Sequence, residues 1–395
     1  MKAKIIMINV VTAIQLLHII YIPFLTLDRT MYGHVLVITF PILLFTCWKS
    51  LKQTRYFKLI IMYFCVLLAS ILFLQSSSIS IFPRFASPLL ILASIEEKER
   101  KYFKWIFYVL IVFFIANAFL AIIERITYTH YIEYDMENSM FADQVALGEL
   151  NDNAFRSFAL FGHPLWNANI MAFMSFMFYY CSDLKRNVRF YLLLLGIISL
   201  FCFNARGAII ISSILLIPTF KDYIKHSKYK IFTLLLVGFC ILWSVLNFHR
   251  IGGRFIDSGV VDDSSIVRLY TINEFINMPF ENLLFGGYEY EYGENGYLEI
   301  IMTYGLIIGG LKIVAELFFG YKFISNNNKK IRWIIFLSVI LIGSTNNNLY
   351  GGRVFPFYLL CLAYIENYSN RRIVSNHRSY ILDIRTNHSF FHRRT

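Results

Sequence analysis

Arg206 is the charged residue whose surroundings point most directly to chemistry. It lies in LFCFNARGAIII, where a long apolar stretch is broken only by Asn204, Ala205 and Arg206. Segments 188–203 and 207–224 would form helices of roughly 24 and 27 Å, short for two complete crossings of a bilayer. We therefore expect the turn and its guanidinium to lie slightly below the membrane surface. An ionisable group at that depth is costly, so a phosphate at headgroup level is the expected partner, and a salt bridge with a carboxylate is the alternative.

Other arginines share one feature with Arg206, because they too lie in segments that contain no lysine. A guanidinium group is a planar fork that binds phosphate or carboxylate with two parallel hydrogen bonds, and it stays charged in a low dielectric. For Arg29, Arg125 and Arg250 we favour simple pairing with acids or lipid headgroups. The further candidates for anion binding are Arg84, Arg156, Arg268 and Arg353.

The segment around Arg268 predicts a helix at the membrane surface. Ser264 or Ser265 can cap its start, and Pro279 ends it. Its apolar residues recur near helical spacing and are Ile266, Leu269, Ile272 and Ile276. Such a helix would lie on the membrane surface or on the outer ends of the spans, with Arg268 on its more polar side. The glycine pair 286–287 then supplies a turn where the backbone can approach another group closely.

A turn that contains His163 leads into another apolar segment. Pro164 suits the first turn of a helix, where its missing N–H costs little. His163 has three possible roles: a general base, a hydrogen-bond donor to phosphate, or an interfacial polar residue. Trp166 is most simply an interfacial aromatic residue. Asn167 and Asn169 enter the apolar segment, so we expect them to face protein rather than lipid.

Three acids precede the apolar segment that starts near residue 297. They are Glu289, Glu291 and Glu294, interleaved with tyrosines. A carboxylate near a helix N-terminus is stabilised by the helix dipole, which accounts for one acid but less well for a cluster. The alternative explanation for the cluster is that these carboxylates take part in a reaction at the boundary between lipid and water.

Composition defines the class of protein that carries these residues. The chain of 395 residues is 57% hydrophobic and 16% charged, which is too apolar for a soluble enzyme. We predict an all-α polytopic membrane protein with about twelve spans: 5–25, 31–48, 57–74, 79–95, 103–123, 164–181, 188–203, 207–224, 231–248, 297–319, 331–348 and 352–367. The six cysteines all fall within these spans, and their spacing indicates neither a metal site nor a disulfide framework.

Lysines predict the topology of a single membrane domain over residues 1–370. They occur at the N-terminus and in every second loop, whereas loops 124–163 and 249–296 contain none. The positive-inside rule therefore places both termini in the cytoplasm and the two long loops outside. Lys312 lies within a span, where we expect it to reach toward the cytoplasmic surface. The basic tail 371–395 contributes to the net charge of +12, which we interpret as a topology signal with lipid attraction, without nucleic-acid binding.

The order of these pieces resembles the O-antigen polymerase and O-antigen ligase superfamily of bacterial membrane glycosyltransferases. The similarity is carried by Arg156 with GHP and an asparagine at the sixth span, then NARGA, then the loop with PFENLLFGGY, and then ENGYLEIIMTYGLIIGG. It covers roughly residues 155–311, while the first 120 residues match in hydropathy only. The resemblance implies a GT-C-like fold in the bacterial inner membrane, with its active site facing outside.

The resemblance also implies roles for individual residues. Arg206 and Arg268 foremost would hold the diphosphate of a lipid carrier, with Asn295 as a further binding residue. In ligases a histidine usually stands where this chain has Glu294, which favours a polymerase with a carboxylate base, and His163 is the second candidate for the base. No nucleotide, metal or other cofactor is required. The implied partners are undecaprenyl-diphosphate-linked oligosaccharide, membrane lipids, a chain-length regulator and a flippase.

Three functions remain open at the level of sequence. A polymerase would transfer the growing polysaccharide, whether O antigen, capsule or exopolysaccharide, to the next lipid-linked repeat unit. A ligase would transfer finished polymer to another acceptor. A flippase for lipid-linked oligosaccharide or a secondary transporter would also fit twelve spans, but no repeat between the halves is evident, and the charges cluster at the outer ends rather than at the midplane.

Overall fold

Every element in the described part of the protein is a helix. The computed structural model describes residues 2–19, 29–73, 79, 81–132, 155–226, 263–289, 295–324, 326, 328–344 and 354–365. The α-helices are α1 (Lys2–Ile19), α2 (Arg29–Lys52), α3 (Phe57–Phe73), α4 (Ile81–Ser94), α5 (Lys104–Thr127), α7 (Pro164–Cys181), α8 (Arg186–Cys202), α9 (Arg206–His226), α12 (Asp263–Asn277), α13 (Phe280–Phe285), α14 (Gly296–Tyr304), α15 (Gly310–Lys322), α16 (Lys329–Gly343) and α17 (Val354–Tyr364). Short 3₁₀ turns span Glu97–Phe103 and Ala159–Phe161, and a π-helical turn spans Gly305–Gly309.

The predicted spans coincide with helices wherever the structure describes them. Eleven of the twelve overlap a helix, and segment 231–248 lies outside the described residues. Five helical stretches are long and apolar enough to cross a membrane: Lys2–Ile19, Tyr32–Lys52, Lys98–Thr127, Arg206–Lys225 and Gly296–Lys322. Shorter apolar helices occupy Phe57–Ile71, Ile81–Ser94 and Val354–Tyr364. An apolar helical protein is therefore confirmed, while the number of crossings and the orientation stay predictions.

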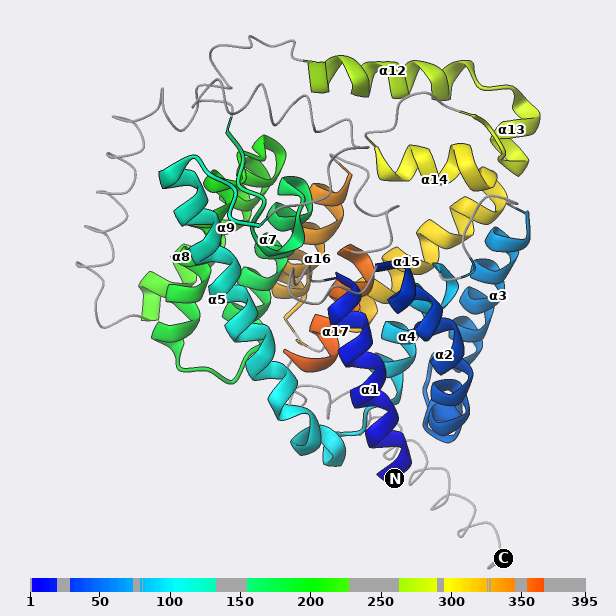
Figure 1. Cartoon of the computed structure of the whole chain (residues 1–395), viewed down its shortest axis with the longest axis horizontal. Coiled ribbons are helices and arrows are strands. Elements are labelled where there is room, and N and C mark those ends of the chain that lie inside the picture. Colours follow the sequence, from blue (N-terminus) through cyan, green and yellow to red (C-terminus); the bar gives the residue numbers. More distant parts are fainter. Residues whose placement is uncertain are drawn as a thin grey trace, which may run out of the picture.

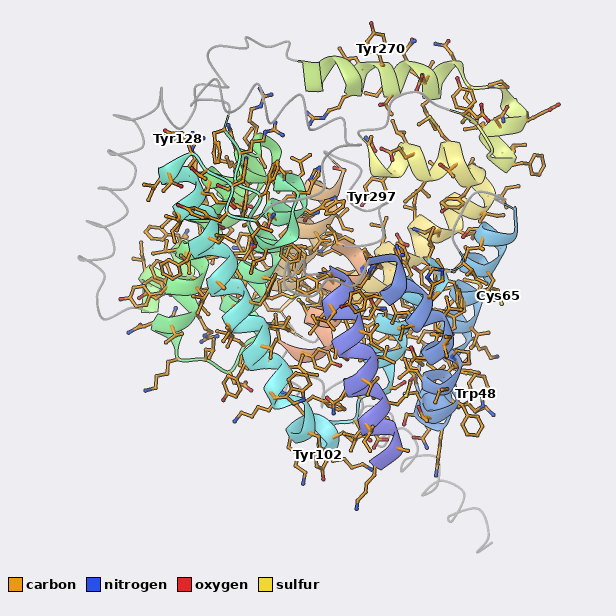
Figure 2. All side chains as sticks on the ribbon, in the orientation of Figure 1. Trp48, Cys65, Tyr102, Tyr128, Tyr270 and Tyr297 are labelled. Atoms are coloured by element: carbon orange, nitrogen blue, oxygen red, sulfur yellow. The ribbon has the colours of Figure 1, made fainter. Side chains whose placement is uncertain are left out.

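Most helices run between two ends of the molecule. The N-terminus and the start of α5 lie at one end, and α12 and α13 lie across the other (Figure 1). Trp48 and Tyr102, which neighbour lysine-rich segments, lie toward the first end, whereas Tyr128 and Tyr270 lie toward the second (Figure 2). We call these the lysine-bearing end and the α12 end. The lysine-bearing loops near Trp48 and Tyr102 thus share one end, as the alternation along the sequence predicts.

Helix α7 is the centre of the packing. It contacts α8, α16, α17 and α5. Nearly every residue of α7 is buried, and Asn167 and Asn169 are fully buried as predicted. Phe173 packs edge-on against Tyr358 of α17, with ring centroids 5.5 Å apart. A helix that is apolar on all sides is typical of the middle of a bundle, and α7 therefore supports the elements at both of its ends.

At the lysine-bearing end, an ion pair holds α1 to the 3₁₀ helix Glu97–Phe103 that precedes α5. Lys4 Nζ lies 2.7 Å from Glu99 Oε2, and both side chains are buried. The same Lys4 ammonium donates a hydrogen bond to Ser50 Oγ of α2 at 2.9 Å. Glu99 also closes the first turn of its 3₁₀ helix, because its carboxylate accepts from the Glu96 amide at 3.0 Å. One buried cluster thus joins three segments of the chain.

Candidate functional site

The turn between α8 and α9 gives Arg206 its position. Helix α8 closes with a hydrogen bond from the Phe203 amide to the Ser199 carbonyl at 3.1 Å. Asn204 follows with φ of 50°, a left-handed conformation in which asparagine is enriched several-fold over most residues. Helix α9 then begins at Arg206, whose side chain is half-buried. The short NAR turn therefore places a guanidinium at a helix N-terminus near the buried bundle.

Three sources of positive potential converge at this turn. The N-terminus of α9 carries about half a positive charge from its aligned peptide dipoles. Arg206 adds a full charge in the first position, where a cation is electrostatically disfavoured. Arg268, on α12, lies close enough for its charge to act on Arg206 and is itself half-buried. The structure thus brings together two arginines that are distant in the sequence, in an arrangement that attracts an anion.

Helix α12 turns Arg268, Thr271 and Glu274 toward the bundle, and its outward side mixes apolar residues with exposed Asn273 and Asn277. Thr271 is fully buried, and Arg268 Nε and Glu274 Oε2 are buried atoms. Leu269 and Ile276 on the opposite face are 63% and 72% exposed. The predicted helix is confirmed, although Ser264 and Ser265 lie inside it rather than at its start, and Pro279 follows its end. The buried Nε of Arg268 is consistent with a guanidinium turned toward the bundle, from a helix that lies across the α12 end (Figure 1).

Helix α5 holds the segment that precedes His163. Glu124 Oε2 accepts hydrogen bonds from the amides of Phe158 and Ala159 at 2.7 and 3.0 Å. Two turns earlier, Asn117 Oδ1 accepts from the Leu160 amide at 2.8 Å. Both side chains are fully buried. These bonds satisfy three amides at the start of the short 3₁₀ turn Ala159–Phe161, where a helix has no carbonyl partner of its own to offer.

The same segment brings Arg156 to the α8–α9 turn. The Ser157 amide donates to the Cys202 carbonyl, the last residue of α8, at 3.1 Å. Arg125 Nη1 donates to the Phe155 carbonyl at 2.7 Å, and its guanidinium lies over the ring of Tyr128. Arg125 therefore has a structural role through a backbone carbonyl and an aromatic ring, and the acid or lipid headgroup that we expected as its partner stays a prediction. Arg156, next to Ser157, is half-buried beside the hairpin that carries Arg206.

His163 is the N-cap of α7. Its Nδ1 accepts a hydrogen bond from the Leu165 amide at 3.2 Å, and its ring stacks on Trp166 with centroids 4.9 Å apart. In a neutral imidazole one nitrogen accepts and the other carries hydrogen, so Nε2 is the donor here. Of the three roles open to His163, this geometry favours a hydrogen-bond donor over a general base.

Two glycines join the α12–α13 arm to a break in the next helix. Gly286 and Gly305 have φ of 83° and 73°, and a Cβ on Gly305 would lie 2.3 Å from the Leu284 carbonyl oxygen. The amides of Gly287 and Tyr288 donate to the carbonyls of Thr303 and Met302 at 2.9 and 3.2 Å. The predicted span 297–319 is accordingly divided into α14, a π-helical turn and α15, and the carbonyls freed at the break are satisfied by the arm.

Of the remaining predicted site residues, the structure describes Asn295 and Arg84, and it gives both of them other partners. Asn295 is the N-cap of α14, because its Oδ1 accepts from the amides of Tyr297 and Leu298 at 3.1 and 3.3 Å. Arg84 lies on α4, which contacts α2, α17 and α3, and its backbone carbonyl accepts from the side chain of Gln15. Glu294 and Arg353 lie outside the described residues, so their roles stay predictions.

The structure corrects the expectation for Lys312. Instead of reaching toward the surface, its side chain is buried, with Nζ 2.6 Å from Glu316 Oε1 and 4.5 Å from the centroid of the Phe85 ring. The Tyr63 hydroxyl donates to the same Glu316 oxygen at 3.0 Å. The carboxylate one turn away on α15 keeps the ammonium inside, because a paired charge need not reach water. Helical spacing of Lys312 and Glu316 was the signal available in the sequence.

Sequence reasoning also missed two buried acids near the site, Glu124 and Glu299. Glu299, in the first turn of α14, is 2% exposed, and Glu124 is fully buried. An acid within an apolar helix is a signal that the sequence offers for both. In the part of the chain that the structure describes, no group of three or more His, Cys, Asp and Glu side chains could hold a metal ion.

Comparison of the chain with known protein families, with curated proteins and with solved structures found no match. The geometry of the site therefore carries the functional argument.

Proposed function

We propose that this chain is a membrane glycosyltransferase that polymerises polysaccharide repeat units. In this reaction the growing glycan leaves a polyprenyl diphosphate carrier and is transferred to a hydroxyl group of the next lipid-linked repeat unit. The proposed place is the outer face of the bacterial cytoplasmic membrane. The observation that carries the proposal is that Arg268 of α12 lies close enough for its charge to act on Arg206, the first residue of α9.

The diphosphate leaving group gains negative charge as its bond to the anomeric carbon of the sugar breaks. Cations that are already in position stabilise that charge without reorganisation in the transition state. Arg206 and Arg268 come from separate elements, and both are half-buried, so their effect is less screened than that of exposed charges. Arg156, held beside the same turn by the Ser157–Cys202 hydrogen bond, is the third candidate for a phosphate contact.

The proton of the attacking hydroxyl group needs an acceptor. We assign this role to Glu294, which adjoins the N-cap of α14 in the sequence. His163 instead has the geometry of a donor, through Nε2, to phosphate or sugar oxygen. In this mechanism the base and the cations act on opposite sides of the anomeric carbon.

The test is replacement of Arg206 with lysine in a strain whose only copy of the protein carries the change. Lysine keeps the charge but cannot bind two phosphate oxygens as a fork. Loss of one charge-assisted contact of about 2–3 kcal/mol would slow elongation roughly 30- to 160-fold. The matched control is Arg332→Lys. Arg332 lies on α16 and donates to the Tyr321 carbonyl, near the cavity that contains Arg186. Arg186 is at the start of α8, whereas Arg206 follows the end of that helix, so the control tests the same substitution away from the proposed site.

Carrier-linked and surface glycans from each strain are then sized together. Single repeat units on the carrier in R206K, with normal polymer in R332K and equal amounts of both proteins in the membrane, support a polymerase. Long polymer that accumulates on the carrier would indicate a ligase. Normal polymer length in R206K, or uptake driven by a proton gradient in proteoliposomes, would refute the proposal.

A further inference from the structure

A cavity of about 140 Å³ lies at the joint between the α12–α13 arm and the broken helix. Helix α13, the π-helical turn and α3 pack together there, at the α12 end of the molecule (Figure 1). We call it the joint cavity, and the described residues that line it are Ser70 of α3, Phe285 with the two glycines that follow it, Thr303, Tyr304 and Ile308. Arg268 lies roughly 14 Å along α12 from the helix end that leads to α13, at 1.5 Å per residue. The joint cavity is therefore separate from the arginine site.

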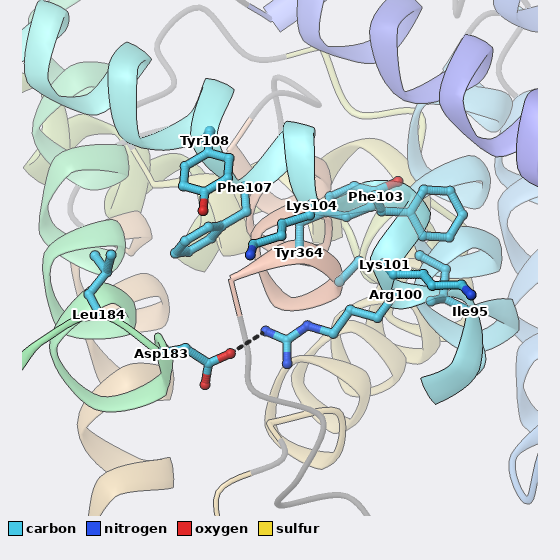
Figure 3. Close-up of a pocket in the computed structure, with 11 residues that line it drawn as sticks. Ile95, Arg100, Lys101, Phe103, Lys104, Phe107, Tyr108, Asp183, Leu184 and Tyr364 are labelled. Atoms are coloured by element: carbon cyan, nitrogen blue, oxygen red, sulfur yellow. Dashed lines mark ion pairs between the residues drawn. The ribbon is translucent and has the colours of Figure 1, made fainter.

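None of the described residues that line the joint cavity is charged. A larger cavity at the lysine-bearing end differs in this respect, because its lining includes lysines and an ion pair between Arg100 Nη2 and Asp183 Oδ2 at 3.2 Å (Figure 3). A charged ligand in a partly enclosed site needs an opposite charge or several hydrogen bonds to replace its hydration. The joint cavity therefore suits an uncharged ligand rather than phosphate or another ion.

The hydroxyl group of Thr303 is the polar group of this cavity that lacks a partner. Thr39, Thr127 and Thr219 each donate their hydroxyl to the carbonyl four residues earlier in the helix, at 2.8, 2.9 and 2.9 Å. Thr303 of α14 makes no such bond, and its Oγ1 is a buried atom without a hydrogen-bond partner in the described structure. Buried hydroxyl groups in native proteins are almost always paired. The Thr303 hydroxyl can therefore serve a ligand as donor and as acceptor.

The rest of the lining offers an acceptor, open backbone and an aromatic ring. Ser70 Oγ donates to the Leu67 carbonyl at 2.7 Å, and its oxygen can still accept. A Cβ on Gly287 would meet no atom within 4 Å, so open space adjoins the backbone of this lining residue. Phe285 is 70% exposed, so its ring is free to contact a ligand. The face of an aromatic ring carries partial negative charge and attracts polarised C–H groups.

We propose that the joint cavity binds one uncharged sugar of the oligosaccharide substrate. This inference rests on the proposed function and adds a glycan subsite away from the anomeric carbon that reacts. A sugar ring has hydroxyl groups at its edge for Thr303 and Ser70, and C–H groups on its face for Phe285. An acyl or prenyl chain has no group that could pair with Thr303, so its binding would leave that hydroxyl buried and unpaired. An unpaired hydroxyl, a lining without charge and an exposed ring together favour a sugar.

The test titrates the purified full-length protein in nanodiscs with the oligosaccharide that mild acid releases from the carrier lipid of the host strain. Thr303→Val removes the hydroxyl group and keeps the shape of the side chain. Gly287→Asn places a side chain in the open space, and asparagine tolerates the φ of 75° at this position. The matched control is Thr127→Val, because Thr127 lies on α5, outside the cavity, and donates within its own helix. A parallel titration with dioleoylglycerol tests a neutral lipid as the ligand.

Thr303→Val should weaken oligosaccharide binding about 10-fold, because a sugar hydroxyl loses its partner, while Thr127→Val should stay within about twofold of the parent. Gly287→Asn should weaken binding further, and Thr303→Val keeps the test decisive if the asparagine variant does not fold. No saturable binding by the parent, or equal binding by the parent and Thr303→Val, would overturn the subsite. Binding of dioleoylglycerol without the oligosaccharide would assign the cavity to lipid and overturn it as well. The released oligosaccharide carries no diphosphate, so normal polymer in R206K would refute the proposed function independently of this result.

Discussion

Replacing Gly305 with alanine should destabilise the joint between the α12–α13 arm and the broken helix. The new Cβ would lie 2.3 Å from the Leu284 carbonyl oxygen and 2.6 Å from the Gly286 nitrogen, both of which are backbone atoms. Backbone atoms cannot rotate away as a side chain can, so the chain segments around Gly286 and Gly305 must move apart. A left-handed conformation also costs an L-residue about 1–2 kcal/mol.

The size of the effect follows from the bonds that would be lost. Separation breaks the hydrogen bonds from Gly287 to Thr303 and from Tyr288 to Met302, each of which contributes about 1 kcal/mol net. With the conformational cost, the loss is about 3–4 kcal/mol. Gly310→Ala is the matched control, because its Cβ would meet only Leu306 Cδ1 at 3.8 Å and its backbone is helical. Alanine at a helical glycine should stabilise by up to about 1 kcal/mol.

Thermal unfolding in detergent with a thiol-reactive dye measures both variants. Four cysteines are buried and react only when the fold opens: Cys47, Cys181, Cys202 and Cys361. At roughly 2 °C per kcal/mol for a chain of this size, G305A should unfold about 6–8 °C below the parent and G310A at or slightly above it. A G305A midpoint equal to that of G310A would refute the contact between Gly286 and Gly305.

Two further substitutions test buried polar groups. Lys312→Met should lower the free energy of unfolding by about 3–5 kcal/mol, because it leaves the Glu316 carboxylate buried without its cation. The double variant K312M/E316L should recover most of that loss. A double variant no more stable than the single one in the dye assay would argue against the ion pair. Glu124→Ala should cost about 2–4 kcal/mol, since the amides of Phe158 and Ala159 lose their acceptor, and should also shorten the polymer through the displacement of Arg156. Its neighbour Ile123 is 46% exposed, so Ile123→Ala should change stability by at most about 0.5 kcal/mol, and equal effects of the two substitutions would contradict the role of Glu124.

The positions of the helices could be predicted because long apolar runs leave few alternatives to a helix. The break at Gly305 could not, since GLIIGG continues the apolar pattern without interruption. Its cause is a backbone contact with Gly286, almost twenty residues earlier, which leaves no periodic signal. The glycines 286 and 287 themselves were recognised as a place of close approach, but their partner was not.

The candidate site was predictable residue by residue and not as an arrangement. Arg206 and Arg268 each stood out by position, but their proximity depends on α12 turning Arg268 toward the bundle. The acceptor role of Glu124 was likewise invisible, because the amides that it binds lie more than thirty residues further along the chain. Asn295 was expected only to bind the lipid carrier, and its role as the N-cap of α14 was not predicted.

The joint between the arm and the broken helix has a consequence for the size of the ligand. Both of its hydrogen bonds join main-chain groups, and the two facing glycines leave no side chain between them. Through α13 this joint anchors the C-terminal end of α12, the helix that carries Arg268. If the proposed function is correct, the position of Arg268 relative to Arg206 is therefore set before the ligand binds, and selection among phosphate compounds would depend on the length of the molecule as much as on its charge.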